Sequence, residues 1–176
     1  MLMQPLPNTL DVRKAAARGV SLSGTVEPTD LVRLSELLQG KEDSVQADIS
    51  LSKDEENRFL IHVVVTAQLT VICQRCLAGL AVSLATDNTI AVVWTDEQAG
   101  HLPRYLDGLV CADEACNLWE LVEDELILSL PAFNYHETEQ CKELLIGYAP
   151  PILEDQDGDK PNPFNVLAQL KPSKKH

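Results

Sequence analysis

The sequence has few basic residues and lacks the segments that direct proteins into membranes or out of the cell. It carries 14 Lys and Arg against 27 Asp and Glu, which gives a formal net charge of −13 at pH 7. Nucleic acids are usually bound by basic surfaces, so this charge argues against tight RNA binding and favours basic partners. The sequence has no signal-peptide pattern and no apolar run near the roughly 20 residues that span a bilayer. We therefore expect a cytoplasmic protein without membrane contact.

Motifs that mark common enzyme classes are also missing. The sequence contains no glycine-rich phosphate loop, no nucleophile elbow and no Ser/His/Asp constellation in a fitting context. Its 45% apolar and 23% charged residues are typical of a globular chain, and 176 residues suit one ordinary domain. We expect most of the chain to fold as one domain.

Alternation of apolar and polar residues predicts β-strands in the first two thirds of the chain. Residues 45–51 and 59–71 alternate strictly and are joined by a short charged turn, which predicts a long hairpin. A third strand is expected at residues 80–84, with a continuation at 90–94. The fold class is therefore α+β, with a mostly antiparallel sheet.

Two helices are predicted by apolar spacing. One covers residues 29–38, and the other covers about 117–130, where Asn117 suits the N-cap and Pro131 ends the helix. The second helix should pack on the sheet and carry a row of acids on its outer face: Glu120, Glu123, Asp124 and Glu125. We interpret this face as a docking surface for a basic partner, with Glu120, Glu123 and Asp124 in contact. A magnesium site of an RNA-processing enzyme is the alternative.

The C-terminal region predicts a change in organisation. We expect a single domain over residues 1–148 and an acidic flexible linker over 149–160. Residues 161–176 should form a docking segment, with a short helix after Pro163 that packs back on the domain. The segment ends in a basic tail, and any direct RNA contact is expected there: Lys171, Lys174 and Lys175.

The CxxC pair Cys73 and Cys76 lies in a turn between two predicted strands. Zinc is commonly held by such a pair, and His136 and Cys141 could complete four ligands from one loop after the second helix. The site would be structural, because it would tie the turn to the C-terminal half. Two alternatives remain open: unligated thiols, with Cys73 continuing the buried face of its strand, and a thiol oxidoreductase. The oxidoreductase fits the context less well, because its attacking thiol usually lies at a helix N-terminus.

The remaining cysteines have no matching partner pair in the sequence. An odd total of five cysteines without an export signal favours thiols or metal ligands over disulfides. Cys111 and Cys116 are therefore expected to be free thiols, at a strand end and in a loop.

Several strings in a fixed order carry a resemblance to a known family. The chain resembles the YceD-like family, the bacterial large ribosomal RNA subunit accumulation proteins, over about residues 5–171. The strings are Cys73-Gln-Arg-Cys76, Asp96-Glu-Gln-Ala99 with Leu102-Pro103, Leu121 to Pro131, His136 with Cys141, and Lys160-Pro-Asn-Pro-Phe-Asn-Val-Leu-Ala168 running on to Lys171.

This resemblance implies a non-enzymatic ribosome biogenesis factor. Such a factor would support synthesis, processing or stability of 23S rRNA. Its partner would be a large-subunit ribosomal precursor, a ribosomal protein or an rRNA-processing factor. The resemblance implies no catalytic residues, and it assigns no role to Cys111 or Cys116.

Overall fold

The computed structural model describes residues 4–40, 44–111, 113 and 115–143 of this chain. The predicted linker 149–160 and segment 161–176 lie outside these residues. The strands are β1 (Thr9–Asp11), β2 (Ser21–Val26), β3 (Ser44–Lys53), β4 (Phe59–Ile72), β5 (Gly79–Val93), β6 (Asp107–Val110) and β7 (Ala115–Asn117). The helices are α1 (Val12–Arg18), a 3₁₀ turn (Pro28–Asp30), α2 (Val32–Ser35), α3 (Asp96–Gly100), α4 (Leu118–Ser129) and α5 (Glu139–Glu143).

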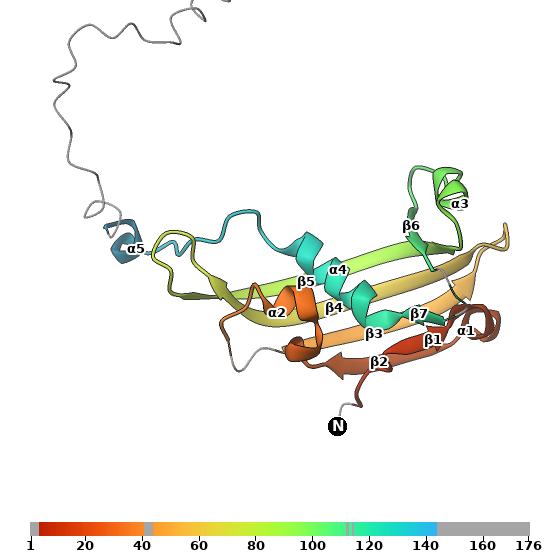
Figure 1. Cartoon of the computed structure of the whole chain (residues 1–176), viewed down its shortest axis with the longest axis horizontal. Coiled ribbons are helices and arrows are strands. Elements are labelled where there is room, and N and C mark those ends of the chain that lie inside the picture. The colour runs from red at the N-terminus through yellow and green to blue at the C-terminus, as the bar shows by residue number, and fades with distance from the viewer. Residues whose placement is uncertain (1–3, 41–43, 112, 114, 144–176) are drawn as a thin grey trace, which may run out of the picture.

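A five-stranded sheet in the order β2-β3-β4-β5-β6 forms the body (Figure 1). Its first four strands pair antiparallel, whereas the short β6 pairs parallel with the last residues of β5. The predicted hairpin is confirmed as β3 and β4. The third strand and its continuation are one uninterrupted strand, β5. The predicted α+β class with a mostly antiparallel sheet is therefore confirmed.

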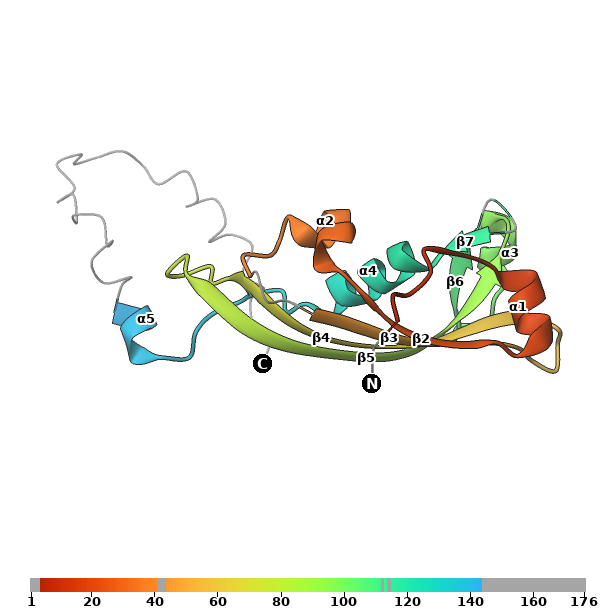
Figure 2. The same ribbon diagram turned by 90° about the horizontal axis from the view of Figure 1, so that it is seen from below.

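One face of this sheet carries the core. Alternate residues of β3 and β4 are buried. Their side chains face α4 and form one core with its apolar residues. Figure 2 shows α2 and α4 on this face of the curved sheet. Among the described helices, none has the length and apolar character needed to cross a membrane.

Helix α4 begins and ends as its sequence predicts. The side chain of Asn117 accepts hydrogen bonds from the backbone N–H groups of Trp119 and Glu120, at 3.0 and 3.2 Å. This cap satisfies two of the donors that every helix leaves open in its first turn. Leu118, Val122 and Leu126 are fully buried, so the apolar stripe of α4 packs against the sheet.

The predicted helix over residues 29–38 is wrong in its extent. Only the 3₁₀ turn at 28–30 and the four-residue α2 form. The chain leaves the helical path because Leu38 bridges Val71, and the Gln39 N–H donates to the carbonyl of Thr70 at 2.8 Å. Pairing with the end of β4 therefore replaces the last turn of the predicted helix.

The predicted outer acidic face of α4 is wrong for two of its four residues. Glu123 and Glu125 are only 4% and 5% exposed. Glu125 accepts a hydrogen bond from the side-chain amide of Asn88 on β5. Burial of a carboxylate is costly unless the carboxylate is paired or hydrogen-bonded. Both acids therefore bind partners inside the protein and are not available to an external one.

Glu123 is bound by the first turn of α2. It accepts hydrogen bonds from the backbone N–H groups of Arg33 and Leu34 at 2.6 and 3.0 Å, and its carboxylate pairs with the Arg33 guanidinium at 2.8 Å. The same guanidinium reaches Asp124 at 2.7 Å. Burial raises the pKa of Glu123, but the Leu34 and Arg33 N–H groups and the Arg33 charge outweigh it and lower the pKa below its usual value.

Replacement of Glu123 by Gln should lower the free energy of unfolding by roughly 1.5–3 kcal/mol, the range for hydrogen bonds to charged groups. Because the folded-state pKa is depressed, this stability is present above the unfolded pKa of about 4.5 and is lost as the pH falls through the folded value. Urea denaturation at pH 7 and at stepwise lower pH measures both effects.

The matched control is Glu120→Gln on the exposed side of the same helix, where the change should stay within about 0.5 kcal/mol. Equal stability of the two variants at pH 7, or a difference that does not shrink in acid, would contradict the assigned role of Glu123.

Candidate metal centre

The CxxC pair lies in the tight turn between β4 and β5, as predicted. The Cys73 N–H donates to the carbonyl of Ala78, and the Leu77 N–H donates to the carbonyl of Cys73, both at 2.9 Å. Leu77 adopts a φ of 59°, in the left-handed region that non-glycine residues seldom occupy. This compact turn brings the sulfurs of Cys73 and Cys76 into one cluster.

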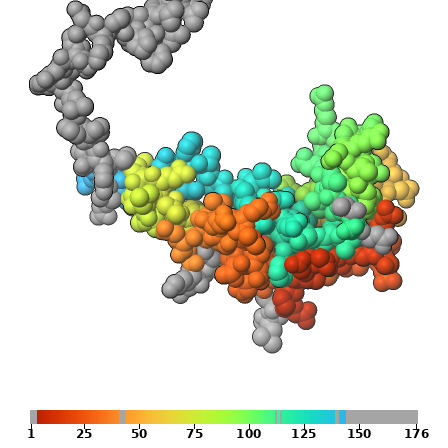
Figure 3. All heavy atoms as spheres, viewed as in Figure 1, coloured from red at the N-terminus to blue at the C-terminus, as the bar shows by residue number. Residues whose placement is uncertain are grey.

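The other two residues of the candidate site come from the segment after α4. The Gln74 N–H donates to the carbonyl of Asn134 at 2.9 Å and so joins this segment to the turn. His136 follows two residues later, and Cys141 lies on α5. In Figure 3 the atoms of the β4–β5 turn (yellow) touch those of the segment after α4 (cyan).

The structure brings all four predicted ligands together. Their ligand atoms lie within 4.8 Å of one another. The sulfurs of Cys73 and Cys141 are 3.6 Å apart, and the Cys76 sulfur is 3.3 Å from Nδ1 of His136. Tetrahedral zinc bonded to sulfur and nitrogen would hold its ligand atoms about 3.5–3.8 Å apart. The Cys3His group can therefore bind a metal ion.

His136 is already oriented for such a role. Its Nε2 lies 3.1 Å from the carbonyl of Gly79 and donates to it. The proton on Nε2 leaves the lone pair of Nδ1 free on the side of Cys76. Metal-binding histidines usually donate their second ring nitrogen in this way, which fixes both the tautomer and the ring orientation.

The electrostatics of the sulfurs suit a cation. Burial raises the pKa of the Cys73 thiol, but backbone N–H groups of Cys76, His136 and Arg75 point at its sulfur and bring the pKa down to about 5. Burial raises the pKa of the Cys141 thiol, and the sulfurs of Cys73 and Cys76 raise it further. The cluster therefore stabilises one thiolate by itself, and a bound cation would favour ionisation of the other thiols.

The two alternative interpretations of these cysteines fare differently. Cys73 is fully buried and continues the inner face of β4, as the unligated interpretation expects. The oxidoreductase needs an accessible sulfur at a helix N-terminus, whereas Cys73 is enclosed in a turn between strands. In the part of the chain that the structure describes, the Cys3His cluster is the one grouping of His, Cys, Asp and Glu side chains able to hold a metal ion.

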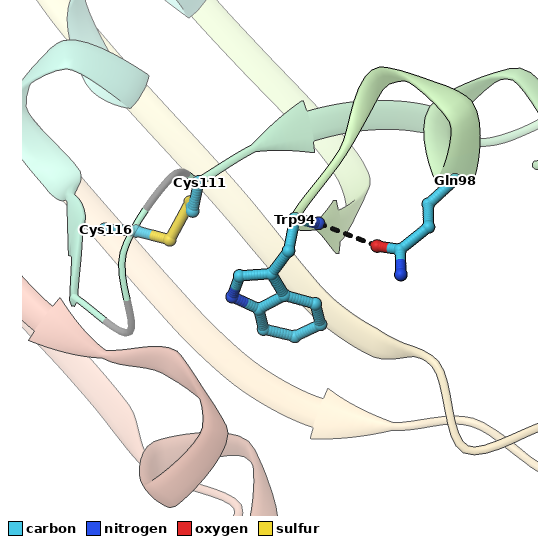
Figure 4. Close-up of a disulfide and its surroundings, with 4 residues drawn as sticks. All are labelled: Trp94, Gln98, Cys111 and Cys116. Atoms are coloured by element: carbon cyan, nitrogen blue, oxygen red, sulfur yellow. Dashed lines mark hydrogen bonds between the residues drawn. A yellow bond between two sulfur atoms is a disulfide. The ribbon is translucent and has the colours of Figure 1, made fainter.

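Cys111 and Cys116 form a disulfide, so the prediction of two free thiols is wrong. Their Cα atoms are 5.6 Å apart, and the bond links the residue after β6 to β7 (Figure 4). Both residues are buried in the core beside Trp94. The sequence could have indicated this pair. If three of the five cysteines cluster with His136, the two that remain are Cys111 and Cys116, which are only five residues apart.

The predicted partner-binding residues are divided among different environments. Glu120 is exposed, Asp124 is half-buried, and both line a cleft of about 560 Å³ between α2 and α4. Glu123 lines the same cleft, but its carboxylate is already hydrogen-bonded to the backbone of α2. Lys171, Lys174 and Lys175 lie outside the described residues.

Comparisons with known proteins agree on one family. The family model of the large ribosomal RNA subunit accumulation protein YceD matches residues 61–171. The chain is also 30% identical over 167 residues to the large ribosomal RNA subunit accumulation protein YceD of Haemophilus influenzae, which covers 94% of this chain and 96% of that protein. No solved structure matches the chain. These two matches lead to one conclusion: the chain belongs to the YceD family of large ribosomal RNA subunit accumulation proteins.

Proposed function

We propose that this protein supports the accumulation of 23S rRNA as a non-enzymatic factor that binds an assembly partner. Membership of a family named for large ribosomal RNA subunit accumulation is the observation that carries this proposal. The partner is a large-subunit precursor, a ribosomal protein or an rRNA-processing factor.

A structural metal site supports a binding role over a catalytic one. Catalytic zinc sites usually have three protein ligands and an open position for water or substrate, whereas closed sites have four. Cys73, Cys76, His136 and Cys141 offer a full set of four ligands around one point. Bound zinc would join the β4–β5 turn to the segment after α4 and would leave no position for a substrate.

The buried acids also argue against a metal-dependent nuclease on α4. Glu123 is occupied by Arg33 and Leu34, and Glu125 by Asn88. These contacts turn both carboxylates away from solvent, where an RNA substrate and its magnesium ions would have to bind.

The cleft between α2 and α4 is the surface that best fits a basic partner. Its exposed acids are Asp30 and Glu120, and its apolar lining includes Val32, which is 68% exposed. A basic segment with an apolar residue would match both features, and the net charge of −13 would speed its approach. Any direct RNA contact would be weak or limited to the tail residues Lys171, Lys174 and Lys175.

The zinc assignment predicts about one zinc ion per chain in the protein purified under reducing conditions. Cys76→Ser and Cys141→Ser should each reduce the zinc content. Chelation should lower the melting temperature of the wild type by roughly 5 °C or more, since 1 kcal/mol shifts it by about 2–4 °C in a domain of this size. Elemental analysis and thermal denaturation measure the two effects.

The matched control is the double variant Cys111→Ser/Cys116→Ser, which also removes two cysteines and should keep its zinc. A reduced, folded wild type without zinc, or a chelator effect that persists in Cys76→Ser, would rule out a zinc site at this cluster.

The binding proposal predicts co-sedimentation of the protein with large-subunit precursors in a sucrose gradient. Asp30→Asn/Glu120→Gln should weaken this association and lower the ratio of 23S to 16S rRNA in cells whose own copy is removed. The matched control is Glu55→Gln/Glu97→Gln, which neutralises two other exposed acids. This variant should associate with the precursors as the wild type does and should restore the ratio of 23S to 16S rRNA. If both double variants restore a normal ratio, the acidic cleft is not the docking surface. If removal of the gene leaves 23S rRNA unchanged, the proposed function itself is wrong.

A further inference from the structure

Strand β5 has an open edge along most of its length. It pairs with β4 over residues 79–92, but β6 covers its other side only at residues 90–93. Within the described residues, no backbone hydrogen bond reaches that side of β5 between Leu80 and Thr89. Alternate N–H and C=O groups of about ten residues therefore point away from β4 without a backbone partner.

This edge carries few of the features that usually keep an edge strand from pairing. It contains no proline, lysine or arginine, and Asp87 is its only charged residue. Its register with β4 is continuous over all fourteen pairs, so no bulge twists it away. Natural edge strands of this length are normally protected or covered.

The opposite edge of the sheet shows how this protein covers an edge. There the Leu6 N–H donates to the carbonyl of Thr25 on β2 at 2.9 Å, and the Thr25 N–H donates to the carbonyl of Gln4 at 3.0 Å. A terminal segment therefore lies along β2, with Pro5 bridging Thr25 in parallel.

The apolar face of the sheet is also incomplete at β5. The β4 residues Val71, Leu69 and Ala67 are 2%, 2% and 3% exposed. Their direct partners on β5 point to the same face but are only half-buried: Leu80, Val82 and Leu84. An added element beside β5 would therefore have apolar side chains to cover as well as backbone groups to pair.

We propose that residues 164–171 of this chain add to the open edge of β5 as a sixth strand. Pro163 and Pro172 bound this segment, which is where proline is tolerated around a strand. Its residues alternate, and one set is apolar and would continue the core face beside the half-buried residues of β5: Phe164, Val166, Ala168 and Leu170.

The same residues also predict a short helix, because Phe164, Leu167 and Leu170 follow a three-residue spacing. Both patterns fit the sequence, and the open edge of β5 favours the strand. The other face of that strand would carry mostly polar residues beside the polar outer face of the sheet: Asn165, Gln169 and Lys171.

The chain can reach this edge. The described part ends at Glu143, two residues after Cys141, and His136 of the same cluster touches Gly79 at the start of the edge. Residues 144–163 can span up to about 65 Å when extended, whereas ten residues of a strand cover about 33 Å. The YceD family model also extends to residue 171, so it includes the segment.

Amide hydrogen exchange of the full chain, followed by NMR, tests this proposal. Alternate amides of β5 face β4 and the open edge, so the β4-facing amides report whether the body of the protein stays folded. In the wild type, both sets should be protected between residues 80 and 88. In Val166→Pro/Leu167→Pro, one proline must fall on the side that faces β5, and the edge-facing amides should exchange roughly tenfold faster or more.

The matched control is Ser173→Pro/Lys174→Pro, which places two prolines beyond Pro172 and should leave exchange unchanged. The proposal is overturned if the edge-facing amides of the wild type exchange as fast as loop amides. It is also overturned if they stay protected in the double-proline variant, or if their protection depends on protein concentration, which would indicate a second copy. The test uses purified protein alone, so its outcome is independent of the proposed role in rRNA accumulation.

Discussion

The packing of the helical layer depends on one buried carboxylate. Helix α2 has only four residues and no side-chain cap of its own, so it could not persist in isolation. Glu123 supplies the missing acceptor from α4, ninety residues later in the sequence, and binds two N–H groups in the first turn of α2. The Arg33 guanidinium then balances the charge that this cap brings into the interior. Because α4 itself packs on the sheet, this side chain joins α2 to the sheet together with the buried side chains of Leu31 and Leu34.

The cysteine and histidine cluster connects a different pair of segments. The β4–β5 turn extends beyond the part of the sheet that α2 and α4 cover (Figure 2). In the segment after α4, Phe133 and Tyr135 stay 70% and 43% exposed, so no apolar core holds this segment to the turn. Cys73 and Cys76 meet His136 and Cys141 at this end of the sheet. Hydrogen bonds from Gln74 and His136 already align the two segments, so metal binding would not have to order them from a random state.

Local patterns in the sequence predicted the long strands, the capped helix α4 and the composition of the metal cluster. Strict alternation in β3 and β4, and Asn117 before an apolar stripe, are signals that depend only on near neighbours. The short strands β1, β6 and β7 were not predicted, because pairing with other strands holds them in place, as between Leu10 and Cys116. Helix α1 was not predicted either, although Asp11 caps its first turn and Gly19 ends it. Burial of Glu125 could have been predicted, since it lies four residues after Leu121 and therefore within the apolar stripe. Burial of Glu123 could not, because its partner Arg33 is distant in the sequence.

The chain contains one disulfide, Cys111–Cys116, and three free thiols, and the two kinds of sulfur are stable under opposite redox conditions. Oxidising conditions preserve that bond, but they also convert unprotected thiolates to sulfenic acids or mixed disulfides. Reducing conditions protect Cys73, Cys76 and Cys141 while they open the bond. A metal ion on the three thiolates would remove this conflict, because ligated sulfur is a poorer nucleophile. If metal were bound before oxidation, Cys111 and Cys116 would be the two sulfurs left to pair, whereas oxidation before metal binding would leave all five cysteines open to pairing.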